Sequence, residues 1–135
     1  MEKLTIDATI ENLETVTEFI TSSLEEKDCP IKIIMQMELV MEEIFVNVAS
    51  YAYRPNVGSV TVCKEIEDAP RAIKITFIDG GVDFNPLAKE DPNINASVEE
   101  RNIGGLGIFL VKKNVDDIFY ERKDGKNIFT VKKFF

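Results

Sequence analysis

The sequence contains no histidine and no tryptophan, and only two cysteines. Without histidine, a Ser-His-Asp triad, a Cys-His pair, a histidine metal site and a histidine phosphoacceptor on this chain are all excluded. Cys29 and Cys63 lie far apart and form no Cys-x-x-Cys pair, which argues against a structural zinc site. A disulfide between them is left open, with two reduced thiols as the simpler expectation.

Basic side chains are also scarce, with 16 lysines and arginines against 24 acidic residues and a net charge of −8. This balance argues against direct binding of nucleic acid and against docking on an anionic membrane. Residues 1–7 lack the apolar core of a signal peptide, and no hydrophobic run is long enough to span a bilayer. The sequence therefore predicts a cytoplasmic protein.

What the chain does contain is typical of one globular domain. It has 135 residues, of which 44% are hydrophobic and 30% charged, enough for a real core. We expect a single domain over residues 1–135.

Periodicity and turn signals predict the order strand, helix, helix, strand, strand, long loop, helix, strand, strand. The second helix is the most apolar, with Met35 among its expected core residues, and should lie at the centre of the domain. Asp124-Gly125 is a strong hairpin signal. The expected elements are a strand at 3–7, helices at 9–27 and 31–51, strands at 59–67 and 71–78, an irregular segment at 79–105, a helix at 106–114 and strands at 118–122 and 127–134.

Strands joined by short turns imply a mixed, largely antiparallel sheet, and the helices should cover one of its faces. The predicted fold class is therefore α/β, a two-layer sandwich. The irregular segment at 79–105 is long for a compact domain, and such loops are usually functional.

Three short motifs could carry chemistry. Glu43 and Asn47 lie four apart on one face of an apolar helix, where a bound cation with a polar ligand could compensate their burial. The alternative is that Glu38, Glu42 and Glu43 form a solvated stripe and that Asn47 bonds to the backbone. Asp79 ends an apolar strand, where it could accept a hydrogen bond from an amino group, and Gly81 would let a flat ligand approach; the alternative is a simple glycine turn.

The third motif, Arg101-Asn102-Ile103-Gly104-Gly105-Leu106-Gly107, is a glycine-rich loop that opens a helix. Backbone N–H groups at such a helix start suit phosphate, and Arg101 could clamp a terminal phosphate. The glycine spacing fits neither the dinucleotide fingerprint nor the Walker loop, which leaves a flexible turning loop as the alternative.

In their order and separation, these motifs resemble the N, G1 and G2 boxes of the GHKL ATPase superfamily, and within it the anti-sigma-factor serine kinases of the RsbW type. The resemblance covers nearly the whole chain, and the short segment between Pro86 and Arg101 fits these kinases better than chaperones or topoisomerases. It implies the Bergerat ATP-binding fold.

The resemblance also implies roles for single residues. Glu43 matches the general base and Asn47 the ligand of Mg²⁺, while Asp79 with Gly81 matches the adenine site. Thr130 stands where relatives have a threonine near adenine. The expected phosphate lid is formed by Arg101, Gly104, Gly105, Leu106 and Gly107.

The implied activity is that of an ATP- and Mg²⁺-dependent serine/threonine protein kinase, in agreement with the missing histidine. The resemblance implies a STAS-type anti-anti-sigma protein as its substrate, a sequestered sigma factor as a second partner, and a homodimer. The alternative is a nucleotide-gated module that binds a partner without significant catalysis.

Overall fold

The computed structural model describes residues 1–53, 56–88 and 105–135. Five strands form one sheet in the order β1-β2-β3-β5-β4, and every pairing is antiparallel. The elements are β1 (Glu2–Asp7), a 3₁₀ turn (Ile10–Asn12), α1 (Leu13–Glu26), α2 (Ile31–Asn47), a π-helical turn (Val48–Ala52), β2 (Ser59–Asp68), β3 (Arg71–Asp79), a 3₁₀ turn (Pro86–Ala88), α3 (Gly105–Asn114), β4 (Asp117–Lys123) and β5 (Lys126–Phe134).

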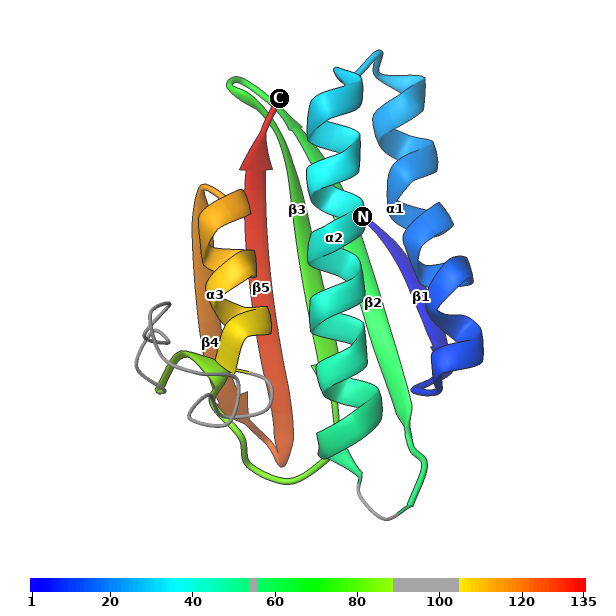
Figure 1. Cartoon of the computed structure of the whole chain (residues 1–135), viewed down its shortest axis with the longest axis vertical. Coiled ribbons are helices and arrows are strands. Elements are labelled where there is room, and N and C mark those ends of the chain that lie inside the picture. The colour runs from blue at the N-terminus through cyan, green and yellow to red at the C-terminus, as the bar shows by residue number, and fades with distance from the viewer. Residues whose placement is uncertain (54–55, 89–104) are drawn as a thin grey trace.

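The three α-helices lie side by side on one face of the sheet, with α2 between α1 and α3 (Figure 1). The predicted two-layer α/β sandwich is confirmed. The sheet was expected to be mixed, but all the pairings between the described strands are antiparallel. None of the helices in the described part of the chain is long and apolar enough to cross a membrane.

The apolar face of α2 forms the centre of the core, as predicted. Its buried side chains recur every three or four residues, which places them on the face toward the sheet. Met35 was expected among them, but it is 63% exposed, because it lies on the opposite face beside Ile31. The buried residues of α2 are Ile34, Met37, Val40, Met41, Ile44 and Phe45.

The hairpin between β4 and β5 forms at Asp124-Gly125, as predicted. Both residues have positive φ angles, 53° and 75°, which is the backbone of the tight turns that suit the right-handed twist of paired strands. This turn sets the register in which Asn127 faces Arg122, and the neighbouring pairing sets Asn127 opposite Asp79. The two buried cysteines are free thiols, in agreement with the simpler expectation.

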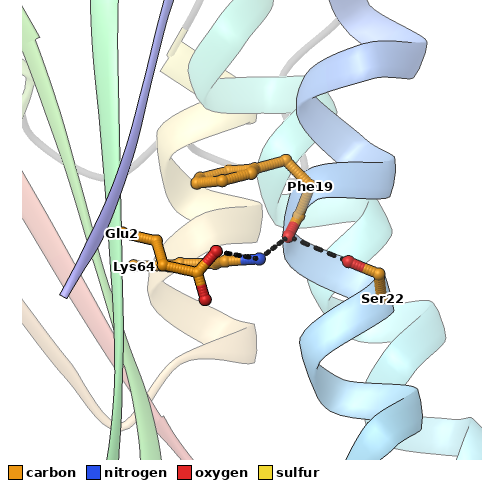
Figure 2. A network of polar contacts seen from close by, with 4 residues as sticks. All are labelled: Glu2, Phe19, Ser22 and Lys64. Atoms are coloured by element: carbon orange, nitrogen blue, oxygen red, sulfur yellow. Dashed lines mark hydrogen bonds and ion pairs between the residues drawn. The ribbon is translucent and has the colours of Figure 1, made fainter.

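Lys64 joins the sheet to α1 (Figure 2). Its side chain is buried, and Nζ donates a hydrogen bond of 2.6 Å to the carbonyl oxygen of Phe19. The same ammonium lies 4.0 Å from the centre of the Phe19 ring and 3.8 Å from Oε2 of Glu2. These contacts compensate the burial of the charge, which would otherwise be costly.

Replacing Lys64 by alanine should lower the free energy of unfolding by about 2 kcal/mol, since a hydrogen bond from a charged group and its packing are lost. Urea denaturation measures the change. The matched control is Lys3→Ala on the adjacent strand, where the side chain is exposed and should contribute almost nothing. Equal stability of the two variants would contradict the role given to Lys64.

Candidate functional site

A pocket opens between the C-terminal half of α2 and the sheet. The cavity is small, ≈ 50 Å³, and opens to solvent. Most of its lining is apolar or aromatic and comes from α2, the π-helical turn, β3, α3 and β5, while the polar groups come from Asn47, Asp79, Tyr120 and Asn127. The apolar and aromatic lining residues are Ile44, Val48, Tyr51, Ala52, Phe77, Phe84, Pro86, Ile108 and Phe129.

Asp79 supplies the carboxylate of this pocket. It is the last residue of β3 and only 7% exposed. Its Oδ1 accepts hydrogen bonds from the Gly81 amide at 2.9 Å and from Nδ2 of Asn127 at 3.0 Å. In the described part of the chain no group donates to Oδ2, so this oxygen can accept a hydrogen bond from a ligand.

Asn47 and Asp79 line the same pocket, although they come from different layers of the fold. Asn47 is the last residue of α2, and Glu43 lies one turn earlier. Glu43 is half-buried, whereas its neighbours Glu38 and Glu42 are exposed. The alternative of a solvated glutamate stripe therefore holds for those two residues and not for Glu43.

The Glu43 carboxylate lies against the first turn of α3. A Cβ atom placed on Gly107 would lie 2.5 Å from Oε2 of Glu43, so a larger residue there would displace this carboxylate. Burial raises the pKa of Glu43 above its ordinary value, and the neighbouring charge of Glu42 raises it further. A carboxyl group with a raised pKa is better matched to proton transfer near neutral pH.

Glycine is required at position 81 for a structural reason that the sequence did not reveal. It does not line the pocket; a Cβ atom there would overlap the backbone carbonyl of Ala52 at the end of the π-helical turn. Val82 N donates to the same carbonyl at 2.8 Å. The close approach in this structure is therefore between two backbone segments, and it holds the turn after β3 against the end of the helix.

Replacing Gly81 by alanine should lower the free energy of unfolding by about 1–3 kcal/mol, because the new methyl group meets backbone that cannot rotate away. Gly80→Ala is the matched control, since a Cβ atom there would be 3.6 Å from the Tyr53 hydroxyl, an ordinary contact. Thermal unfolding measures the difference, and Gly81→Ala should melt at a lower temperature than Gly80→Ala. If both variants melt alike, the packing argument for Gly81 is wrong.

Thr130, which was expected near a bound base, does not line the pocket that contains Asp79. Its hydroxyl pairs with that of Thr76 at 3.2 Å on the face of the sheet opposite the pocket. Asn127, three residues earlier on β5, has its side chain on the helix-covered face instead, because alternate residues of a strand point to opposite faces.

Sequence reasoning missed Asn127, Tyr120 and Arg122. Nδ2 of Asn127 donates to Asp79, and its Oδ1 accepts from the Tyr120 hydroxyl at 2.5 Å and from Nη1 of Arg122 at 3.1 Å. Burial and the nearby carboxylate of Asp83 raise the pKa of Tyr120, so its hydroxyl stays protonated and donates at neutral pH. The hairpin turn was a signal only for the pairing of Asn127 with Arg122. The pairing of β3 with β5, which sets Asn127 opposite Asp79, has no such local signal.

Part of the expected phosphate lid can be placed. Gly105 begins α3, and Leu106 and Gly107 follow in its first turn. The side chain of Leu106 lies outside the described part of the chain, as do Arg101 and Gly104 entirely. The first turn of α3 is next to both Glu43 and the pocket, since Ile108 lines it.

This arrangement can hold a flat heterocycle that carries an amino group. The apolar and aromatic lining would bury its faces, and Oδ2 of Asp79 would accept from the amino group. The N–H groups of a helix's first turn have no partner within the helix, so the start of α3 favours an anion such as a phosphate nearby. Asn47 and Glu43 lie on the α2 side of the same region.

Comparison with known proteins places the chain in a family. Residues 6–133 match the family described as the histidine kinase-like ATPase domain, and the chain belongs to this family. It is 33% identical over 104 residues to the serine-protein kinase RsbW of Bacillus cereus (strain B4264), a match that covers 73% of this chain and 63% of that protein.

A second relative is the serine-protein kinase RsbW of Staphylococcus epidermidis, 29% identical over 105 residues, with 73% of this chain and 65% of that protein covered. The chain thus spans less than two thirds of the length of these relatives. The resemblance to the GHKL ATPases is confirmed at the level of the family.

Proposed function

We propose that this protein is an ATP-dependent serine/threonine protein kinase of the anti-sigma-factor type. Its substrate would be a serine or threonine of a STAS-type anti-anti-sigma protein, and it would also sequester a sigma factor. Membership of the ATPase family and the similarity to serine-protein kinases support this proposal. The observation that carries it is the shared pocket of Asn47 and Asp79, with Glu43 one turn away against the start of α3.

The base of ATP would lie between the apolar walls of the pocket. Asp79 would accept the hydrogen bond of the adenine amino group through Oδ2. The rings of Tyr51 and Phe84, which stack with their centres 6.4 Å apart, stand at the same pocket and could cover the base.

The donor set fits Mg²⁺ bound together with phosphates. Asn47 lines the pocket, and no group in the described residues forms a hydrogen bond with its side chain, so its amide oxygen is available. The described residues contain no cluster of three acidic or cysteine side chains that would hold a metal alone. Mg²⁺ commonly takes one or two protein oxygens and completes its shell with phosphate oxygens and water, and it neutralises charge on the phosphates.

Glu43 would accept the proton of the attacking serine or threonine hydroxyl. Its half-buried carboxylate, with a raised pKa, faces the first turn of α3, where the phosphates would bind. A correctly placed base typically contributes ~10²–10⁴-fold to the rate. Arg101 and the glycines at 104, 105 and 107, with Leu106, would enclose the phosphates as the lid.

The test is transfer of label from [γ-³²P]ATP to a purified STAS-type anti-anti-sigma protein. The wild type should label the partner on serine or threonine, and Glu43→Ala should not. Absence of transfer, with the two forms alike, would contradict the kinase proposal. If ATP still bound in that case, the chain would be a nucleotide-gated partner-binding module instead.

A further inference from the structure

Asn127 is a buried polar residue at the start of β5, with 6% of its surface exposed. Its side-chain amide uses both of its N–H groups: Nδ2 donates to Oδ1 of Asp79 at 3.0 Å and to the carbonyl oxygen of Val82 at 2.7 Å. A primary amide has two N–H groups to donate, so this donor is fully used. Asn127 therefore offers no free N–H group to a ligand in the pocket.

The orientation of this amide follows from its neighbours. Its Oδ1 faces three donors, namely the Tyr120 hydroxyl at 2.5 Å, Nη1 of Arg122 at 3.1 Å and the amide of Phe84 at 3.4 Å. Its Nδ2 faces two acceptors, a carboxylate and a carbonyl. A flipped amide would set N–H groups against an arginine and an oxygen against Asp79, which burial makes costly.

The hydrogen bond from Asn127 limits what the Asp79 carboxylate can accept from a ligand. Oδ1 of this carboxylate already accepts from Asn127 and from the Gly81 amide, which uses its two lone-pair positions. Only Oδ2 is left to accept from a bound base. The pocket therefore presents one acceptor oxygen, although an aspartate can present two.

We infer that Asn127 is a specificity-determining residue, which restricts the pocket to a purine with a single amino donor at this point, namely adenine, and excludes guanine. Guanine offers two adjacent donors, its ring N–H and its amino group, and a carboxylate binds them best with both oxygens. With Oδ1 occupied, that pairing is lost. If guanine took the place of adenine instead, its carbonyl oxygen would face Oδ2, acceptor against acceptor. This inference rests on the proposed nucleotide site.

The direct test is calorimetric titration of the wild type, Asn127→Ala and Asn127→Ser with ATP and with GTP in the presence of Mg²⁺. The wild type should bind ATP and bind GTP far more weakly. In both variants Oδ1 becomes available, so the ratio of the GTP to the ATP dissociation constant should fall about tenfold, the size of one hydrogen bond to a charged group. Serine keeps a polar group near Tyr120 and Arg122 and protects the fold.

Glu121→Gln is the matched control, since Glu121 lies between Tyr120 and Arg122 on β4 but on the open face of the sheet. It should keep the selectivity of the wild type. Equal binding of ATP and GTP by the wild type would overturn the inference, whether or not the variants fold. An unchanged ratio in a folded Asn127 variant would also overturn it. A wild type that binds neither nucleotide would instead reject the proposed function.

Discussion

Replacing Glu43 by glutamine is expected to lower the rate of phosphoryl transfer by about 10²- to 10⁴-fold, because the amide cannot accept the proton of the attacking hydroxyl. ATP binding should remain close to that of the wild type, since the pocket is lined by other residues. Single-turnover label transfer and calorimetry measure the two quantities separately.

The same substitution should stabilise the fold at neutral pH. Burial raises the pKa of Glu43 above its ordinary value of 4.5, so ionisation costs more in the folded protein than in the unfolded chain. The contribution of Glu43 to the free energy of unfolding is fully present below the ordinary pKa, where the carboxyl group is neutral. It is lost as pH rises through the raised pKa of the folded protein. The glutamine variant does not titrate, and its advantage in melting temperature should therefore appear at pH 7 and disappear at about pH 4.

Glu42→Gln is the control on the same helix. Glu42 is exposed, and its removal should leave the transfer rate almost unchanged while lowering the pKa of Glu43 toward the ordinary value. Equal losses of activity in both variants would contradict the distinct role of Glu43. A glutamine variant at 43 with no gain in stability at pH 7 would contradict the burial argument.

Asp79→Asn is expected to abolish the stabilisation that ATP gives to the protein. For the wild type, ATP at 100 times its dissociation constant should add ~2.7 kcal/mol to the free energy of unfolding. In the variant, one of the two carboxylate oxygens becomes an N–H donor. This group faces either the amino group of the base or, with the side chain turned over, the donors of Gly81 and Asn127.

The measurement is the change in the free energy of unfolding that ATP causes in each variant, relative to the same variant without ATP. This comparison separates binding from any loss of intrinsic stability. Asp68→Asn is the control, because Asp68 is also a strand-end aspartate, exposed at the end of β2. It should retain the full shift. A full shift in Asp79→Asn would show that the base is bound elsewhere.

Much of the fold follows from local signals. The apolar period of α2 predicted a central helix, and Asp124-Gly125 predicted the turn that pairs β4 with β5. The period alone could not place Met35, since α2 is apolar on more than one face and only packing decides which face meets the sheet. The π-helical turn after Asn47 likewise has no local signal and was expected as regular helix.

The site was less predictable, because it depends on strand register. Thr130 and Asn127 lie three residues apart on β5, and their side chains point to opposite faces of the sheet. An error of one position in the predicted register would therefore move a side chain from the pocket to the opposite face. The motif positions of Glu43, Asn47 and Asp79 could be predicted, because helix spacing and the strand end fix where they lie. The contacts of Asn127 with Tyr120 and Arg122 required the fold.

The central claim is that one pocket holds ATP between Asp79 and Asn47. A crystal structure of the protein with Mg²⁺ and a non-hydrolysable ATP analogue tests it most directly. We expect the adenine amino group on Oδ2 of Asp79, the metal on the side-chain oxygen of Asn47, and the terminal phosphate near Glu43. A nucleotide bound away from Asp79, or a metal that does not contact Asn47, would contradict the account.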